Sequence, residues 1–233
     1  MSNGWERFVG WLEENVVTSM AQIHTMMPDS LLFGSLLLYF LTQNLSYGVF
    51  AIFLFEMVLG HRMIGWMCSE SVGEGTSASR SNFETRQKDV RCRAGYKIPG
   101  PQGAGRLFTH DAYPSYGMFS IASIAAYLGR GMVDWTPTLT AMKDSWASRP
   151  TVAYVLIGLF VAVFFLARLM YCDGEQVGEL MVALLLGALF GCAGYALNKA
   201  LFGLESMNFL GLPYMASKDE KGDTIYVCAQ VQS

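Results

Sequence analysis

The sequence has little charge and no strong imbalance of sign. Lys, Arg, Asp and Glu together make up 15% of its 233 residues, whereas a soluble domain carries about 25%. The net charge is only −3 at pH 7, so no global basic character predicts a nucleic-acid partner. The low charge argues against an ordinary soluble domain, and 52% of the residues are hydrophobic.

The residues that build metal and catalytic motifs are also sparse. The five cysteines are scattered, with no C-x-x-C pair and no zinc spacing, and none of the three histidines lies at motif spacing. We therefore expect no metal ion, no cofactor and no catalytic residue. Cys68 and Cys92 bracket one loop and either pair or remain free thiols. The N-terminus has no basic region followed by an apolar core, so no cleavable signal peptide is expected.

Long apolar runs are what the chain does have. Residues 151–170 contain a single charge, Arg168, and residues 180–198 contain none. About 20 apolar residues, rising about 1.5 Å each, match the hydrocarbon core of a bilayer. Only helices or closed barrels satisfy their backbone polar groups there. The two runs predict a transmembrane helical hairpin over residues 151–171 and 180–203.

Two further spans are predicted, at residues 31–59 and 115–133. The first has no charge before Glu56, but its centre, residues 42–48, is polar. This centre indicates either a polar face turned into the bundle or a helix broken around Gly48 that lines a site. Glu56 would lie near the end of this span, where it reaches the interface or pairs with His61 or Arg62.

The remaining segments are polar or amphipathic. Residues 1–27 have a helical apolar stripe that predicts an amphipathic interfacial helix, ended by Pro28–Asp29–Ser30. Residues 60–113 form a long polar, basic insertion, residues 134–150 a connector, and residues 204–233 a polar tail in which 224–231 alternate like one strand. The expected fold is an all-α integral membrane protein with four transmembrane helices, an N-terminal amphipathic helix and this long insertion.

Two residue groups are candidates for protein contacts. The basic residues of the insertion favour a cytoplasmic position for it. They form either a docking surface for a partner or a cluster that only fixes topology and contacts lipid head groups. The hypothetical docking residues are Arg86, Lys88, Arg91, Arg93, Lys97 and Arg106. In the last span, Ala183, Gly187 and Gly191 form a small-xxx-small ladder that predicts close helix packing, within the chain or with another subunit.

The order of Lys97, Arg106 and Pro114–Ser115 before a membrane helix resembles the lipid phosphatases of the phosphatidic-acid phosphatase type 2 family. That resemblance implies a phosphate held by basic groups and attacked by a histidine. The pattern departs from the family, because Tyr116–Gly117 replaces the required Gly-His and no later Ser-Arg and His motif follows. Transport is the other alternative. It needs charges within spans, and only Glu56 and Arg168 approach this.

A basic loop containing cysteine leads through residues 111–119 (DAYPSYGMF) into a helix of small residues. Over about residues 45–130 this pattern resembles the multi-pass membrane proteins of large nucleocytoplasmic DNA viruses, which lie beneath an icosahedral capsid. The resemblance implies a structural subunit that tethers the virion inner membrane to the capsid. An accessory subunit of a respiratory or ATP-synthase complex in an organelle inner membrane is the competing interpretation. The expected partners are the lipid bilayer and capsid proteins or complex subunits.

Overall fold

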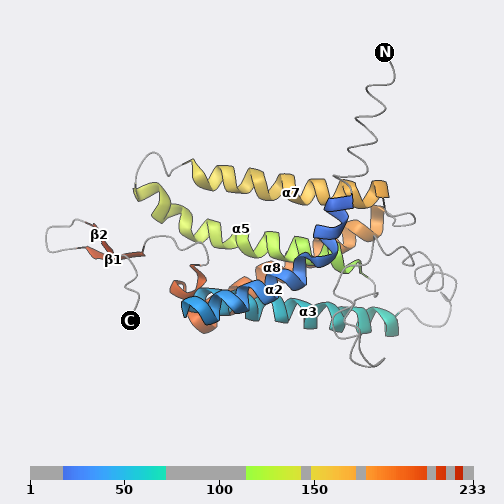
Figure 1. Cartoon of the computed structure of the whole chain (residues 1–233), viewed down its shortest axis with the longest axis horizontal. Coiled ribbons are helices and arrows are strands. Elements are labelled where there is room, and N and C mark those ends of the chain that lie inside the picture. The colour runs from blue at the N-terminus through green and yellow to red at the C-terminus, as the bar shows by residue number, and fades with distance from the viewer. Residues whose placement is uncertain are drawn as a thin grey trace, which may run out of the picture.

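The computed structural model describes residues 18–71, 114–142, 148–171, 177–208, 214–218 and 224–227. Within these ranges, five helices of 23 to 27 residues lie along the long axis of the molecule (Figure 1). They are α2 (Thr18–Thr42), α3 (Leu45–Ser71), α5 (Tyr116–Met142), α7 (Arg149–Tyr171) and α8 (Val177–Phe202), and the short 3-10 helix η4 (Glu205–Met207) follows α8. The predicted helical fold is confirmed for this bundle.

Three of the described helices are long and apolar enough to cross a membrane: Leu45–Met67 in α3, Arg149–Leu169 in α7 and the whole of α8. The apolar part of α2, Met27–Thr42, is shorter. Helix α5 carries Arg130 and Asp134 within its length. The described helices are therefore compatible with an integral membrane protein, while the number of four spans remains a prediction.

The chain reverses direction at Gln43–Asn44, so residues 31–59 do not form one span. Of the two interpretations of their polar centre, the structure shows the broken helix, although the break is not at Gly48. Helix α2 ends at Thr42, and Gln43 adopts a left-handed conformation with φ 56°. The Asn44 side chain then accepts a 3.0 Å hydrogen bond from the backbone N–H of Ser46. This is the bond of a helix N-cap, and it starts α3. The polar residues thus terminate two helices, and the break precedes Gly48.

Pro28 does not end a helix, contrary to the sequence prediction. It lies inside α2, which continues from Thr18 to Thr42. An internal proline removes one backbone hydrogen bond and bends a helix without always breaking it. Helix α2 is bent in its N-terminal part (Figure 1). The amphipathic helix predicted for residues 1–27 lies mostly outside the described residues, and its last ten residues belong to α2.

The core lies between α3, α5 and α8. Phe53, Leu54 and Met57 of α3 are fully buried, as are Met118 and Phe119 of α5. The closest helix pair is α5 and α8, because α8 presents glycines to α5. A Cβ on Gly187 would meet the backbone oxygen of Phe119, and one on Gly191 would meet that of Ser123. Ala183, the first residue of the ladder, is fully buried in the same core.

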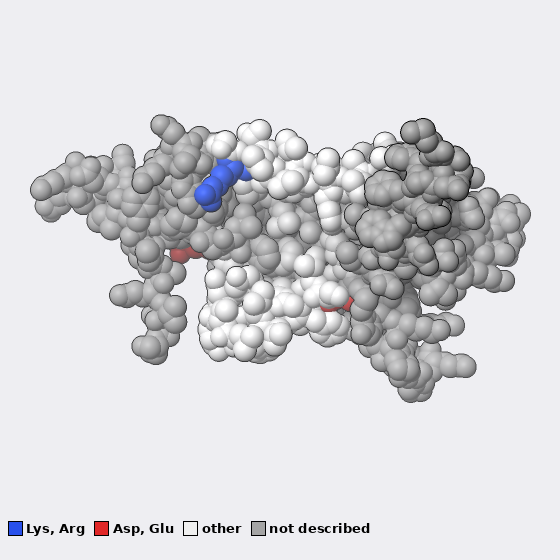
Figure 2. All heavy atoms as spheres, turned by 45° about the horizontal axis from the view of Figure 1, so that its top comes forward, with Lys and Arg blue, Asp and Glu red and all other residues white. Residues whose placement is uncertain are grey.

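Helix α7 lies on the outside of the bundle, beside α5 (Figure 1). The Tyr154 hydroxyl donates a 3.3 Å hydrogen bond to the carbonyl oxygen of Gly129. Only 11% of the most apolar stretch of α7 is buried within the chain, and side chains such as Val155 and Leu159 are exposed. Figure 2 shows an extended surface across the middle of the molecule that is almost free of charged side chains, with acidic atoms only at its edge.

The tail contains two strands rather than one. β1 (Tyr214–Lys218) and β2 (Thr224–Val227) pair antiparallel, with Tyr214 opposite Val227. The sequence predicted the second strand and missed the first, which supplies its partner within the tail. The first residues of the predicted insertion, 60–71, belong to α3 instead. The C-terminal end of α3 and the start of α5 lie at one end of the bundle, and the C-terminal end of α8 lies at the other (Figure 1).

Candidate functional sites

A cluster of ionisable side chains joins α5 to α8. The Tyr195 hydroxyl donates a 2.8 Å hydrogen bond to Oδ2 of Asp134, and the Lys199 ammonium donates one of 2.7 Å to the same oxygen. Burial opposes ionisation of Asp134, but these two hydrogen bonds, with the charges of Lys199 and Arg130, outweigh it and lower the pKa of the carboxyl. Asp134 is therefore a carboxylate held by two donors from the neighbouring helix.

A second polar cluster lies between α3, α5 and α8. Asn198 is fully buried, and its amide nitrogen donates a 3.4 Å hydrogen bond to Oε2 of Glu56. Its amide oxygen has no hydrogen-bond partner among the described residues. The ring of Tyr127 stacks on Phe53 with ring centroids 3.9 Å apart. The Tyr127 hydroxyl donates a 3.8 Å hydrogen bond to the sulfur of Met207 in η4 and interacts with Asn198.

Glu56 lies in the middle of α3, not near the end of a span. The candidate span is Leu45–Met67, and Glu56 is its central residue. The expected position near the end is therefore wrong, because it depended on the unbroken helix over residues 31–59. Among the described residues Glu56 forms no ion pair, and its side-chain hydrogen bond comes from α8 rather than from His61 or Arg62.

His61 connects α3 to the start of α5. Its side chain is fully buried, and its Nε2–H donates a 2.6 Å hydrogen bond to the carbonyl oxygen of Pro114. The imidazole also contacts the rings of Tyr116 and Phe119, with centroid distances of 5.0 and 5.2 Å. A backbone carbonyl is an acceptor only, so His61 carries a proton on Nε2 in this arrangement. The imidazole thereby fixes where the chain enters α5.

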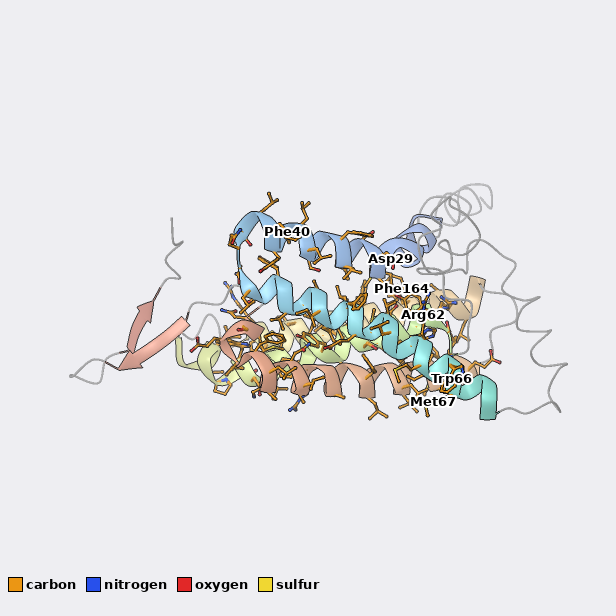
Figure 3. The ribbon with its side chains drawn as sticks, turned by 90° about the horizontal axis from the view of Figure 1, so that it is seen from below. Asp29, Phe40, Arg62, Trp66, Met67 and Phe164 are labelled. Carbon is orange, nitrogen blue, oxygen red and sulfur yellow. The ribbon has the colours of Figure 1, made fainter. Side chains whose placement is uncertain are left out.

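Two charged side chains, one from α2 and one from α3 itself, lie near this connection. Asp29 of α2 and Arg62 of α3 both interact electrostatically with Tyr116, and Figure 3 labels both at this end of the bundle. Asp29 is only 2% exposed. Arg168, in the last turn of α7, is only 4% exposed. Buried charges of this kind require partners, and here they belong to the interior of the bundle.

The residues singled out from the sequence fall into two groups. The hypothetical docking residues from Arg86 to Arg106 lie in residues 72–113, outside the described residues. Ala183, Gly187 and Gly191 lie in α8, where the two glycines contact α5. In the described part of the chain, no three His, Cys, Asp or Glu side chains lie together as metal ligands would. Sequence reasoning missed Asn198, Tyr127 and Tyr195, whose contacts depend on tertiary packing.

Comparison with protein families, with curated proteins and with solved structures finds no match for this chain. Any assignment of function therefore depends on the residues and their contacts.

Proposed function

We propose that this chain is a multi-pass membrane protein with a structural role in a larger assembly. The observation that carries the proposal is the exposure of α7. This helix is long and apolar enough to cross a membrane, yet only 11% of its most apolar stretch is buried within the chain. Lipid, or a helix of another subunit, must cover such a surface. The paired polar groups of the described bundle hold helices together, which supports a structural role.

The specific role that we favour is to tether a viral inner membrane to its capsid. Two features support it: the resemblance of residues 45–130 to viral membrane proteins, and the exit of two polar segments from opposite ends of the bundle. A chain with polar segments on both membrane faces is suited to bridge a bilayer and a protein shell. An accessory subunit of a respiratory or ATP-synthase complex would show the same features and is the competing role.

Gentle detergent extraction, size separation and mass spectrometry of the co-migrating proteins test this proposal. Capsid proteins would support the tether, and subunits of a respiratory complex would support the competing role. A lone monodisperse protein of 25.7 kDa in its detergent micelle would contradict both.

The docking hypothesis needs its own variant, in which Arg91, Arg93 and Lys97 are neutralised together. Loss of the co-migrating partner with unchanged membrane insertion would support docking by the basic residues. Inverted or mixed topology would instead show that these residues act through the positive-inside rule and lipid head groups. Protease protection of the tail from each side of sealed vesicles distinguishes the two outcomes.

Transport is a second candidate, because the position of Glu56 at the centre of a candidate span favours it. It predicts flux that depends on Glu56, Asn44 or Ser46. The lipid phosphatase alternative gains no such support within the described residues, since Ser115 is only 4% exposed. Its basic residues, Lys97 and Arg106, lie outside the described residues. Phosphate released from a lipid by the wild type but not by Ser115→Ala would support the lipid phosphatase alternative.

A further inference from the structure

Two carboxyl groups in the bundle have contrasting surroundings. Asp134 accepts hydrogen bonds of 2.7 and 2.8 Å from Lys199 and Tyr195. Glu56 accepts one bond, of 3.4 Å, from the amide of Asn198. Bonds between a charged N–H donor and an ionised carboxylate are typically about 2.7–2.9 Å long, and bonds from an uncharged donor are weaker. Asp134 thus has a charged donor that compensates a carboxylate, whereas Glu56 has only one long bond from an uncharged amide.

The surroundings of Glu56 also disfavour an isolated negative charge. The Glu56 side chain is partly buried within the chain, and Phe53 and Met57, near it along α3, are fully buried apolar residues. The ammonium of Lys199 is occupied by Asp134. A carboxylate without a cationic partner in apolar surroundings is strongly destabilised, and it becomes neutral by taking up a proton. Among the described residues, no cation pairs with Glu56.

The hydrogen-bonding groups around Glu56 leave an acceptor for that proton. The amide oxygen of Asn198 is buried and has no donor among the described residues. Amide oxygen and nitrogen have nearly the same shape, so a half-turn of the terminal bond exchanges them. The oxygen would then face Glu56 and could accept the O–H of the protonated acid. The hydroxyl of Tyr127, which now donates only to the thioether of Met207, lies close enough to interact with Asn198 as well.

We propose that Glu56 is a proton-binding site within the spanning part of α3, and that its protonated form is the partner of Asn198. Loss of the proton would place an uncompensated charge between α3 and α8. The contact between these two helices therefore depends on the proton, in addition to any structural role of the chain.

Other titratable or charged groups lie on the elements packed against α3 around this site. They are Asp29 and Tyr39 on α2, Tyr127, Arg130 and Asp134 on α5, Tyr195 and Lys199 on α8, and Glu205 on η4. Lys199, which follows Asn198 on α8, is the ion-pair partner of Asp134. Glu205 is exposed. Asp134 is therefore the matched control for Glu56: a carboxyl in the same bundle whose negative charge is compensated.

Dicyclohexylcarbodiimide tests the proposal, because this lipid-soluble reagent reacts with protonated carboxyl groups in apolar surroundings. The acid transfers its proton to a carbodiimide nitrogen while the carboxyl oxygen bonds to the central carbon, and the adduct rearranges to a stable N-acylurea. The full chain in lipid vesicles is treated at a series of pH values, and the modified residue is located by peptide mass spectrometry. We expect the label on Glu56 and not on Asp134, with labelling that declines as the pH rises.

Two controls identify the ligand and the residue. Labelling should be lost in Glu56→Gln and should persist in Asp134→Asn. Sodium ions should not protect Glu56, since protection would show a metal cation in place of the proton and would overturn the proposal. Absence of label on Glu56 at every pH, or equal labelling of Asp134, would also overturn it. The wild-type protein gives the decisive result by itself, so the test does not depend on the folding of Glu56→Gln.

Discussion

Tyr195 and Asp134 are joined by a 2.8 Å hydrogen bond between residues 61 positions apart in the sequence. One helical turn further along α8, Lys199 donates to the same carboxylate oxygen. The two donors and their acceptor hold α5 against α8 near one end of the bundle. Asp134 directly follows the span predicted for residues 115–133, and Lys199 lies in the last turn of α8, so the ion pair lies at the expected membrane boundary.

The lowered pKa of Asp134 predicts how stability depends on pH. A carboxyl whose pKa is lower in the folded state stabilises that state fully above its unfolded pKa of about 3.9. The stabilisation is lost as the pH falls through the lower, folded pKa. We expect the unfolding temperature in detergent to drop below about pH 4, and this contribution to the drop to be absent in Asp134→Asn. Thermal scans of both proteins between neutral and acidic pH measure the effect.

Lys199→Met tests how much of this effect comes from the ion pair. The Lys199 side chain is 41% exposed, so solvent screens its charge, and we expect a loss of less than about 1 kcal/mol. A larger loss in Lys199→Met than in Tyr195→Phe would show that the ammonium, rather than the buried hydroxyl, is the main partner of Asp134.

Gly191 should not tolerate a side chain. A Cβ at this position would meet the backbone oxygen of Ser123 on α5, and backbone atoms move away only if the helices separate. We expect Gly191→Ala to destabilise the bundle by about 1–3 kcal/mol, with a smaller effect in a detergent that already loosens it. Gly158→Ala on α7 is the matched control, because a Cβ added at this position would have no other atom within 4 Å. Equal unfolding temperatures for the two variants would contradict the close α5–α8 contact.

The hydrogen bond of His61, and not only the volume of its side chain, should contribute to the stability of the bundle. His61→Leu keeps a large side chain but leaves the carbonyl oxygen of Pro114 without this donor. The loss of a buried partner costs about 1–3 kcal/mol. His61→Gln, whose amide can donate to the same oxygen, should recover part of it. We expect the unfolding temperature to fall in the order wild type, His61→Gln, His61→Leu. An equal loss in the two variants would assign the effect to packing alone.

The sequence predicted the helices that have a long uninterrupted apolar run. It did not predict the turns and contacts that depend on single residues. The uninterrupted runs at 151–170 and 180–198 correspond to α7 and α8 within a few residues. Hydropathy did not locate the reversal at Gln43, because a polar centre indicates either a packed polar face or a break. Asn198 and Glu56 are 142 positions apart, and no periodicity links them. Their contact exists only because α3 and α8 pack side by side.

The reversal at Gln43 predicts which positions reach water on each side of the membrane. Gln43, Ser148 and Gly178 are exposed. Gln43 follows α2 and Ser148 precedes α7, and these two helix ends lie at the same end of the bundle, whereas α8, which carries Gly178 in its first turn, begins at the other end (Figure 1). In a chain whose native cysteines are replaced, we expect Gln43→Cys and Ser148→Cys to react with a membrane-impermeant maleimide from one side of sealed vesicles. Gly178→Cys should react only from the other side.

A single span over residues 31–59 makes the opposite prediction for Gln43, because it would place this residue near the bilayer centre, where the reagent does not reach. Gln43→Gly is a matched backbone control: glycine adopts positive φ without the steric cost of about 1–2 kcal/mol that other residues carry. It should therefore fold at least as well as the wild type if φ is 56° at this position. An unreactive Gln43→Cys together with a destabilised Gln43→Gly would support the unbroken helix and contradict the reversal. It would also return Glu56 from the centre of a span to its end, where water stabilises its charge and a bound proton is unnecessary.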